Sequence, residues 1–167
     1  MISVLFWNLA ENAGILPHVS CLGRSRSVDI FLFAESPADL GPALRGLNTL
    51  RRGTYEEAGK VRPKVRALSR LRPPDLDHLF TTIGGETSVW SIRAPKLTPS
   101  EVLLAVTHLP AKAGGNTDVG QAQVAGDVTA ELAGFEDSRN HRNTVFVGDF
   151  NMESLRNNLN QFFTVLA

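Results

Sequence analysis

Thr144–Asn151 reads TVFVGDFN, and this stretch near the end of the chain decides how the rest is interpreted. Its first four residues, Thr144–Val147, lack a polar face, which predicts a strand buried on both sides in a sheet. Gly148, Asp149 and Asn151 follow almost directly. Ligands of layered α/β proteins bind beyond the ends of such strands, so the segment predicts a candidate site there. Gly148-Asp149 alone is also typical of an ordinary turn.

Three further segments share this organisation, in which an apolar strand runs directly into a polar side chain. They are Ile2–Trp7 followed by Asn8, Val28–Ala34 followed by Glu35, and Val102–Val106 followed by Thr107 and His108. Each polar residue taken alone has a structural explanation, because Asn often begins a turn and Glu35 can cap a helix before Ser36-Pro37. The same pattern at four strand ends favours one common site.

Helices and strands alternate along the remaining sequence. Apolar residues recur at steps of three and four over Asp118–Phe135 after a capping box, which predicts a helix packed on one face. Weaker helices are expected over Gly14–Leu22, Pro37–Leu50 and Glu153–Leu159, and a hairpin of His78–Ile83 with Thr87–Arg93. This order predicts a layered α/β sheet sandwich. No linker or repeat divides the sequence, so we expect one domain over residues 1–167.

The composition is that of a globular protein, with 43% hydrophobic and 20% charged residues. A single cysteine, Cys21, excludes an internal disulfide framework and a cysteine-rich zinc site. The opening MISVLFW lacks the basic start and cleavage site of a secretory signal, and no apolar run reaches the length of a membrane span. We therefore expect a soluble cytoplasmic protein without a membrane span.

Charge is distributed unevenly although the net charge is zero. Arg45–Arg72 contains nine basic residues and only Glu56 and Glu57 as acids, a local net charge of +7. A basic segment beside acidic metal ligands fits a polyanionic phosphodiester, which makes nucleic acid the favoured partner. The candidate contacts are Arg51, Arg52, Arg62 and Lys64. A solvated surface segment is an equally good interpretation, because Tyr55 is the only tyrosine near it for base stacking.

The side chains at the four strand ends have the chemistry of phosphoryl transfer. Glu35 and Asp149 supply carboxylates, which together with carbonyl oxygens are the ligands that Mg²⁺ prefers. The amides of Asn8 and Asn151 can orient a phosphate oxygen or a water without adding negative charge, and His108 can donate to a phosphate. Together the five residues predict a metal-dependent phosphoryl-transfer site.

Four sequence blocks occur in an order that resembles one family. They are Phe6-Trp7-Asn8, Val28-Asp29-Ile30 leading to Ala34-Glu35, Val106-Thr107-His108-Leu109, and Val147-Gly148-Asp149-Phe150-Asn151. The sequence resembles the endonuclease/exonuclease/phosphatase family, which includes magnesium-dependent nucleases such as DNase I, abasic-site endonucleases, inositol phosphatases, sphingomyelinases and deadenylases. The resemblance implies a two-sheet α/β sandwich of the DNase I-like type.

The resemblance also implies a role for each residue. Glu35 corresponds to the metal-binding glutamate and Asn8 to an asparagine that helps to hold metal and phosphate. His108 corresponds to a histidine that contacts the phosphate. Asp149 corresponds to the aspartate that positions or deprotonates the attacking water, and Asn151 to the asparagine that orients it and touches the phosphate. The implied reaction is in-line hydrolysis of a phosphodiester with Mg²⁺, or Mn²⁺ in its place. The substrate is nucleic acid or another phosphodiester, such as an inositol phosphate or a lipid headgroup, because these enzymes share the core and differ in loops. The basic segment favours nucleic acid.

One part of the family pattern is missing from the sequence. The family continues with further strands and a Ser-Asp-His motif, whereas the residues after Asn151 contain no histidine. We therefore expect an N-terminal portion of such a domain, incomplete at its C-terminus, that needs its missing segment or a complementing chain and hydrolyses poorly alone. The alternative is an inactive phosphate- or protein-binding module on the same scaffold.

Overall fold

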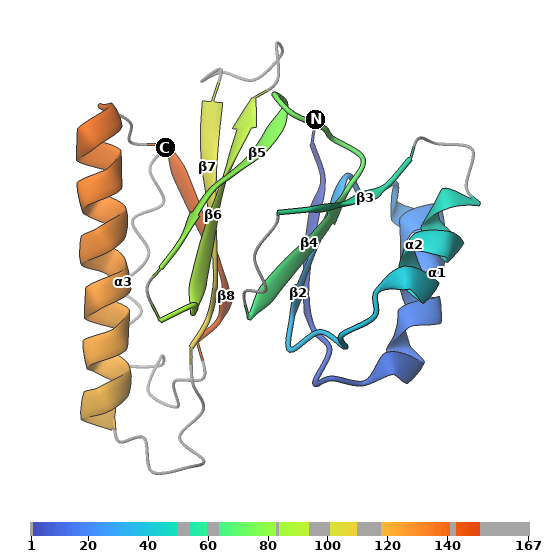
Figure 1. Ribbon diagram of the computed structural model, residues 1–167, viewed down its shortest axis with the longest axis horizontal. Helices are drawn as coiled ribbons and strands as arrows, with labels where there is room; N and C mark the ends of the chain where they lie inside the picture. The colour runs from blue at the N-terminus through green and yellow to red at the C-terminus, as the bar shows by residue number, and fades with distance from the viewer. Residues whose placement is uncertain are drawn as a thin grey trace.

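Two sheets pack face to face, with helices on both outer faces (Figure 1). The computed structural model describes residues 2–49, 54–59, 64–82, 84–93, 101–109, 118–140 and 143–150. Its elements in chain order are β1 (Val4–Asn8), the short 3-10 helix η1 (Ala13–Ile15), α1 (Leu16–Arg26), β2 (Ile30–Ala34), α2 (Gly41–Asn48), β3 (Glu56–Ala58), β4 (Val65–Ser69), β5 (Leu76–Thr81), β6 (Thr87–Arg93), β7 (Glu101–His108), α3 (Asp118–Arg139) and β8 (Thr144–Asp149). The two-sheet α/β sandwich predicted from the sequence is confirmed.

Each sheet contains one parallel pair of strands joined by a helix. The N-terminal sheet has the order β1-β2-β4-β3, and the C-terminal sheet has the order β5-β6-β7-β8. β1 and β2 are parallel and are connected through α1, whereas β7 and β8 are parallel and are connected through α3. The carboxyl ends of these four strands therefore meet at one end of the sandwich, which lies toward the bottom of Figure 1. We call it the site end.

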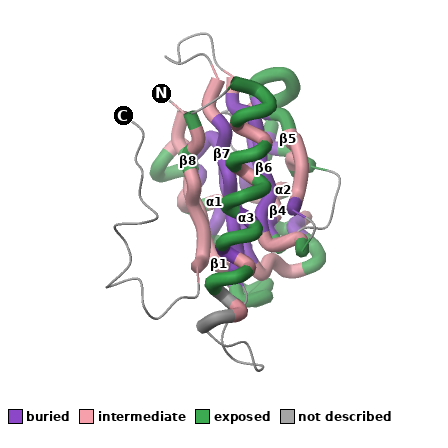
Figure 2. The backbone as a smooth tube through the Cα atoms, turned by 90° about the vertical axis from the view of Figure 1, so that its left-hand side faces the viewer, coloured by how far each residue is buried: buried purple, intermediate pink, exposed green. Residues whose placement is uncertain are grey.

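Three apolar cores hold the four layers together. Ile30 and Leu32 of β2 face the C-terminal sheet and pack with Trp90, whereas Phe31 and Phe33 of the same strand face α1 and α2. All five residues of β2 are buried, which explains why its sequence has no polar face. The third core, under α3, is smaller, and Figure 2 shows that helix mostly exposed beside buried strands.

Most predicted elements are confirmed, and β3 and β4 are the elements that sequence reasoning missed. The strands, the hairpin and the helix from Asp118 are present, although α3 extends to Arg139 and α2 begins only at Gly41. β4 lies within the basic segment and pairs with the buried β2, so this part of the segment is sheet core. Arg66 interrupts the short apolar run of β4, which is why no strand was predicted there. The helix expected over Glu153–Leu159 lies outside the described residues.

None of the described helices has both the length and the apolar character that crossing a membrane would require.

Candidate functional site

The site end gathers four of the predicted residues into one group across the two sheets. Asn8 ends β1 and Asp149 ends β8, while Glu35 follows β2 and His108 ends β7. His108 and Asp149 are direct partners in the parallel ladder, and Asn8 is the ladder partner of Ala34, the residue before Glu35. The chain segments are thus placed by strand register, which is a consequence of the two parallel pairs.

Asn8 links the two sheets through the Asp149 carboxylate. Asn8 Nδ2 donates a hydrogen bond to Asp149 Oδ2 at 2.9 Å, and Asn8 Oδ1 accepts one from the backbone N–H of Ala10, also at 2.9 Å. These two bonds fix which side of the amide faces the carboxylate. The remaining lone pair of Asn8 Oδ1 is still able to bind a cation or a water.

Glu35 and His108 form a second contact between the sheets. His108 Nε2 lies 3.0 Å from Glu35 Oε1, a distance that suits an ion pair. The direction is poor, however, because neither ring nitrogen of His108 has a partner in hydrogen-bond geometry among the described residues. The His108 side chain is 9% exposed and the Glu35 side chain 39%. An under-satisfied, buried imidazole beside a half-exposed carboxylate is an arrangement that favours binding a further polar group.

The backbone at the site end is strained. Glu35 has φ +43°, and Ala10 and Glu11 have φ +47° and +54°, all in the left-handed region that L-residues rarely adopt. The two strained segments are joined, because the Glu11 N–H donates to the Glu35 carbonyl at 2.7 Å. Strain of this kind is typical of functional sites, where the surrounding structure holds a side chain in an unfavourable conformation.

Gly148 is required by the close approach of β7 and β8. A Cβ at this position would lie 2.1 Å from the carbonyl oxygen of Thr107, far inside van der Waals contact. Gly148 and Thr107 are ladder partners one step before His108 and Asp149. Glycine therefore allows the ladder to reach the two site residues in register, which is a physical reason for the Gly148-Asp149 pair beyond a turn.

A third side-chain pair crosses the seam between the sheets at the same end. Lys64 Nζ lies 3.3 Å from Glu86 Oε1, and the Glu86 carbonyl accepts a hydrogen bond from the His108 N–H at 2.8 Å. Lys64 was predicted from the charge of its segment. Glu86 was missed, since it follows the turn at Gly84-Gly85 and no sequence pattern distinguishes it from a loop carboxylate.

Three further cations of the basic segment, Arg66, Arg70 and Arg72, are bound to carboxylates. Arg66 makes a two-pronged contact with Glu57, Arg70 pairs with Asp29, and Arg72 pairs with Glu56. Much of the positive charge counted in the sequence is thus neutralised within the fold. Arg51, Arg52 and Arg62 lie outside the described residues, as does Asn151.

The donor set suits a lightly coordinated magnesium ion. Among the described residues no three His, Cys, Asp or Glu side chains are grouped to enclose a metal. Mg²⁺ usually binds one or two carboxylates and keeps several waters or substrate oxygens, so it needs no such group. Glu35 with the Oδ1 of Asn8 matches that requirement, and Glu35 is exposed enough for solvent to reach it.

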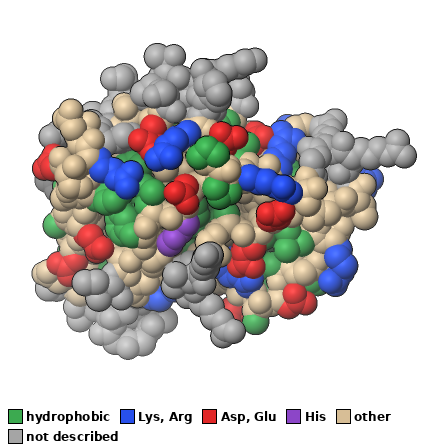
Figure 3. Space-filling model, turned by 45° about the horizontal axis from the view of Figure 1, so that its top comes forward, with side chains coloured by type: hydrophobic (Ala, Val, Ile, Leu, Met, Phe, Trp, Pro, Cys, Tyr) green, Lys and Arg blue, Asp and Glu red, His purple; other side chains and the backbone are tan. Residues whose placement is uncertain are grey.

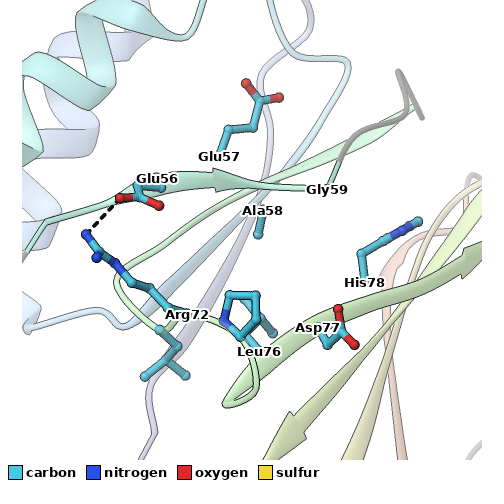
Figure 4. Close-up of a pocket in the computed structure, with 10 residues that line it drawn as sticks. Glu56, Glu57, Ala58, Gly59, Arg72, Leu76, Asp77 and His78 are labelled. Atoms are coloured by element: carbon cyan, nitrogen blue, oxygen red, sulfur yellow. Dashed lines mark hydrogen bonds and ion pairs between the residues drawn. The ribbon is translucent and has the colours of Figure 1, made fainter.

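A hollow of about 530 Å³ lies elsewhere, between β3 and β5, toward the end of the sandwich opposite the site. Figure 4 shows Glu56 and Arg72 paired on its wall, with His78 across from Gly59. Burial lowers the pKa of His78 despite the opposing charge of Asp77. None of the four strand-end residues lines this hollow. We therefore place the candidate site at the strand ends, where the groups suited to phosphoryl transfer lie, and not in the hollow.

The sequence matches no family model and no curated protein. Solved structures do resemble it. An endonuclease/exonuclease/phosphatase family protein from Bacteroides thetaiotaomicron has a TM-score of 0.61 and 15% identity, covering 92% of this chain and 64% of its own. The endonuclease domain of TRAS1, a telomere-specific non-LTR retrotransposon, has a TM-score of 0.53 and 16% identity, with coverage of 92% and 62%. A mutant beta toxin from Staphylococcus aureus with bound magnesium ions has a TM-score of 0.57 and 14% identity, with coverage of 90% and 65%.

These likenesses establish the fold. The chain has the DNase I-like fold of endonuclease/exonuclease/phosphatase structures, which confirms the resemblance drawn from the four sequence blocks. It spans less than two thirds of the length of each of these three structures.

Proposed function

We propose that this chain carries the catalytic site of a magnesium-dependent phosphodiester hydrolase, most simply a nuclease. Mn²⁺ can replace Mg²⁺ in the reaction. The observation that carries the proposal is the pair of contacts across the seam, Asn8 with Asp149 and Glu35 with His108. Two residues from each sheet meet there, although they are far apart in the sequence. Further support comes from the fold, which is shared with proteins described as endonucleases.

Each residue has a role that its surroundings support. Asp149 is the base that positions a water and takes its proton, because its carboxylate is held in place by Asn8. His108 donates to a phosphoryl oxygen, since its buried ring nitrogens have no well-directed partner among the described residues. Glu35 and Asn8 would hold the cation. When bound, Mg²⁺ supplies positive charge that stabilises the negative charge developing on the phosphate.

The order of these groups along the seam fits in-line attack. Asp149 and His108 are lateral neighbours on adjacent strands, so a water held by Asp149 would lie beside a phosphate contacted by His108. Positioning and electrostatics then account for most of the catalysis. Asn151, which the family resemblance assigns to orienting the water, remains part of this proposal.

The test is hydrolysis of bis(p-nitrophenyl) phosphate and of DNA and RNA oligonucleotides with Mg²⁺, Mn²⁺ or EDTA. Asp149→Asn is expected to slow metal-dependent turnover by about a hundredfold or more. Glu35→Gln is expected to weaken Mn²⁺ binding, which electron paramagnetic resonance measures without turnover. Asp127→Asn on the exposed face of α3 serves as the matched control. Unchanged turnover in Asp149→Asn would contradict the proposal.

Binding without turnover is the outcome that would favour the alternative function. The ring nitrogens of His108, which have no hydrogen-bond partner among the described residues, can hold a phosphate whether or not a base acts beside them. A chain that binds oligonucleotide in a Glu35-dependent way, yet hydrolyses nothing until it is supplied with a complementing segment, would be a phosphate-binding portion of the enzyme. A chain that stays inactive under all such conditions would be a binding module.

A further inference from the structure

We infer that Lys64 and Glu86 form a second phosphate subsite next to the catalytic group. It would bind a substrate that carries, besides the phosphate to be cleaved, a flanking phosphate on one side of it. This inference rests on the proposed function. It assigns a role to Glu86 and identifies the substrate class as a nucleic-acid strand.

Three cross-sheet side-chain pairs stand in a row along the seam. The pairs are Asn8 with Asp149, Glu35 with His108, and Lys64 with Glu86. They follow the strand orders, because β1, β2 and β4 are consecutive in one sheet and β8, β7 and β6 in the other. The third pair therefore continues the site by one strand on each side.

Strand register fixes the position of the third pair. Ala34 and Val65 form the last pair of the antiparallel ladder between β2 and β4, so Glu35 and Lys64 each lie one residue beyond it. On the other sheet the His108 N–H donates to the Glu86 carbonyl, which places Glu86 beside His108. Neighbouring strands lie about 4.8 Å apart. Lys64 thus precedes the strand that neighbours β2, and its partner Glu86 is bonded to the His108 backbone, which makes its ammonium group a candidate for a phosphate next to the one that His108 contacts.

Glu86 is the more buried member of the pair, and Lys64 is the member that a ligand can reach. The Glu86 side chain is 14% exposed, whereas that of Lys64 is 44% exposed. A Cβ on Gly84 would lie 1.9 Å from Glu86 Oε2, so the absence of a side chain at Gly84 makes room for the carboxylate. Glu86 uses a single contact of 3.3 Å to hold an ammonium group that has three donors.

The neighbouring cations do not have this freedom. The guanidinium of Arg66 is used by both oxygens of Glu57 and by the carbonyls of Pro37 and Ala38. Arg70 and Arg72 pair with carboxylates at the opposite end of the sandwich. Among Lys64, Arg66, Arg70 and Arg72, Lys64 alone pairs with a residue whose backbone is hydrogen-bonded to His108, which is why the subsite is assigned to it.

A single-phosphate substrate would not use this subsite. A diester with one phosphate is satisfied by His108 and the cation, and it would leave Lys64 paired with Glu86. A strand with a flanking phosphate can exchange that partial contact for a stronger one, because ammonium–phosphate pairs are charge-assisted. The expected gain in affinity from the flanking phosphate is about tenfold.

The experiment compares thymidylyl-thymidine with its 5′- and 3′-phosphorylated forms by calorimetry with Mg²⁺. All proteins carry Asp149→Asn so that no ligand is consumed. One of the phosphorylated forms is expected to bind about tenfold tighter than the unphosphorylated dinucleotide. Lys64→Met is expected to remove this gain and leave the affinity for the unphosphorylated dinucleotide unchanged.

Arg72→Met is the matched control, because Arg72 is an exposed, paired cation of the same segment at the opposite end. It should keep the full gain. If the protein that retains Lys64 binds none of the dinucleotides, the proposed function is wrong. Binding without a gain, or a gain that survives Lys64→Met, would overturn the subsite alone. A gain seen with glycerophosphoinositol 4-phosphate over glycerophosphoinositol, but not with dinucleotides, would overturn the nucleic-acid assignment.

Discussion

The two ends of the sandwich are built from similar residues and differ in how well those residues are satisfied. At the site end, Glu35 occupies a strained conformation and the buried His108 has no well-directed hydrogen bond among the described residues. At the opposite end, Asp29 accepts from the Ser3 N–H at 2.7 Å, from Ser3 Oγ at 2.8 Å and from Arg70 Nε at 2.6 Å. Polar side chains at the site end are available to a ligand, whereas those of the Asp29 group at the opposite end are hydrogen-bonded to one another.

The opposite end contains further pairs of this kind. Arg93 pairs with Glu101 at 2.9 Å, and Glu101 also accepts from the Ser91 hydroxyl. Acidic and basic side chains are interleaved over this face in Figure 3, so it presents no field of one sign. Local rules of good packing and hydrogen bonding are broken mainly where a protein must bind something, and the contrast therefore supports the proposal that ligands bind at the site end. Four predictions test it.

The largest effect is expected for His108→Leu. The change removes the proposed phosphate contact and should lower metal-dependent phosphodiester turnover by about a hundredfold or more. Its effect on stability should be small or favourable, because an apolar side chain replaces a buried polar group that has no well-directed partner in the described part of the chain. Turnover and urea unfolding are measured on the same preparation, with His78→Leu as the active control. A large loss of stability would mean that His108 is mainly structural.

The next effect is expected for Asp29→Ala at the opposite end. The change leaves Arg70 and Ser3 without their shared acceptor and should lower the free energy of unfolding by roughly 2 kcal/mol. Catalysis and Mn²⁺ binding should be unaffected, because the strand ends at the site do not contact Asp29. Urea denaturation measures the loss, and Asp75→Ala, an exposed carboxylate, is the control. Equal losses in both variants would remove the proposed difference between the ends.

The strand ends were predictable from the sequence because their signal is local. The runs before Asn8, Glu35, His108 and Asp149 are apolar on both faces, and a buried strand followed by a polar residue can be recognised without knowing its neighbours. β4 was not predictable in this way. Its place beside β2 depends on long-range pairing that covers Val65, Ala67 and Leu68, and Arg66 interrupts the run.

The pairing of charges was beyond sequence reasoning for the same reason. Arg70 and Asp29 are 41 residues apart, and Lys64 and Glu86 are 22 apart, so no periodicity connects them. Counting charge along Arg45–Arg72 therefore overstated the number of basic side chains that are available to bind a ligand. The conformation of Glu35 was also invisible, because glutamate carries no preference for positive φ that a sequence pattern would reveal.

A smaller effect is expected from acid. Burial alone would raise the pKa of Asp29, but the hydrogen bonds from Ser3 and Arg70 outweigh it and hold the pKa below its ordinary value. The stabilisation is therefore fully present above the unfolded-state pKa of about 3.9 and is lost as the pH falls through the lower folded-state value. The stability difference between the native chain and Asp29→Ala should be constant from pH 7 to about pH 4. A difference that instead begins to shrink near neutrality would contradict this assignment.

The smallest effect is expected from relieving strain at Glu35. Glu35→Gly and Glu35→Ala both remove the carboxylate and should both abolish Mn²⁺ binding, but only glycine adopts φ +43° without steric cost. Glu35→Gly should therefore be more stable than Glu35→Ala by roughly 1 kcal/mol. Ser36, whose φ is not positive, supplies the control pair. There the order should reverse, because glycine gains more entropy in the unfolded chain. If alanine is the more stable at both positions, the backbone of Glu35 stores no strain.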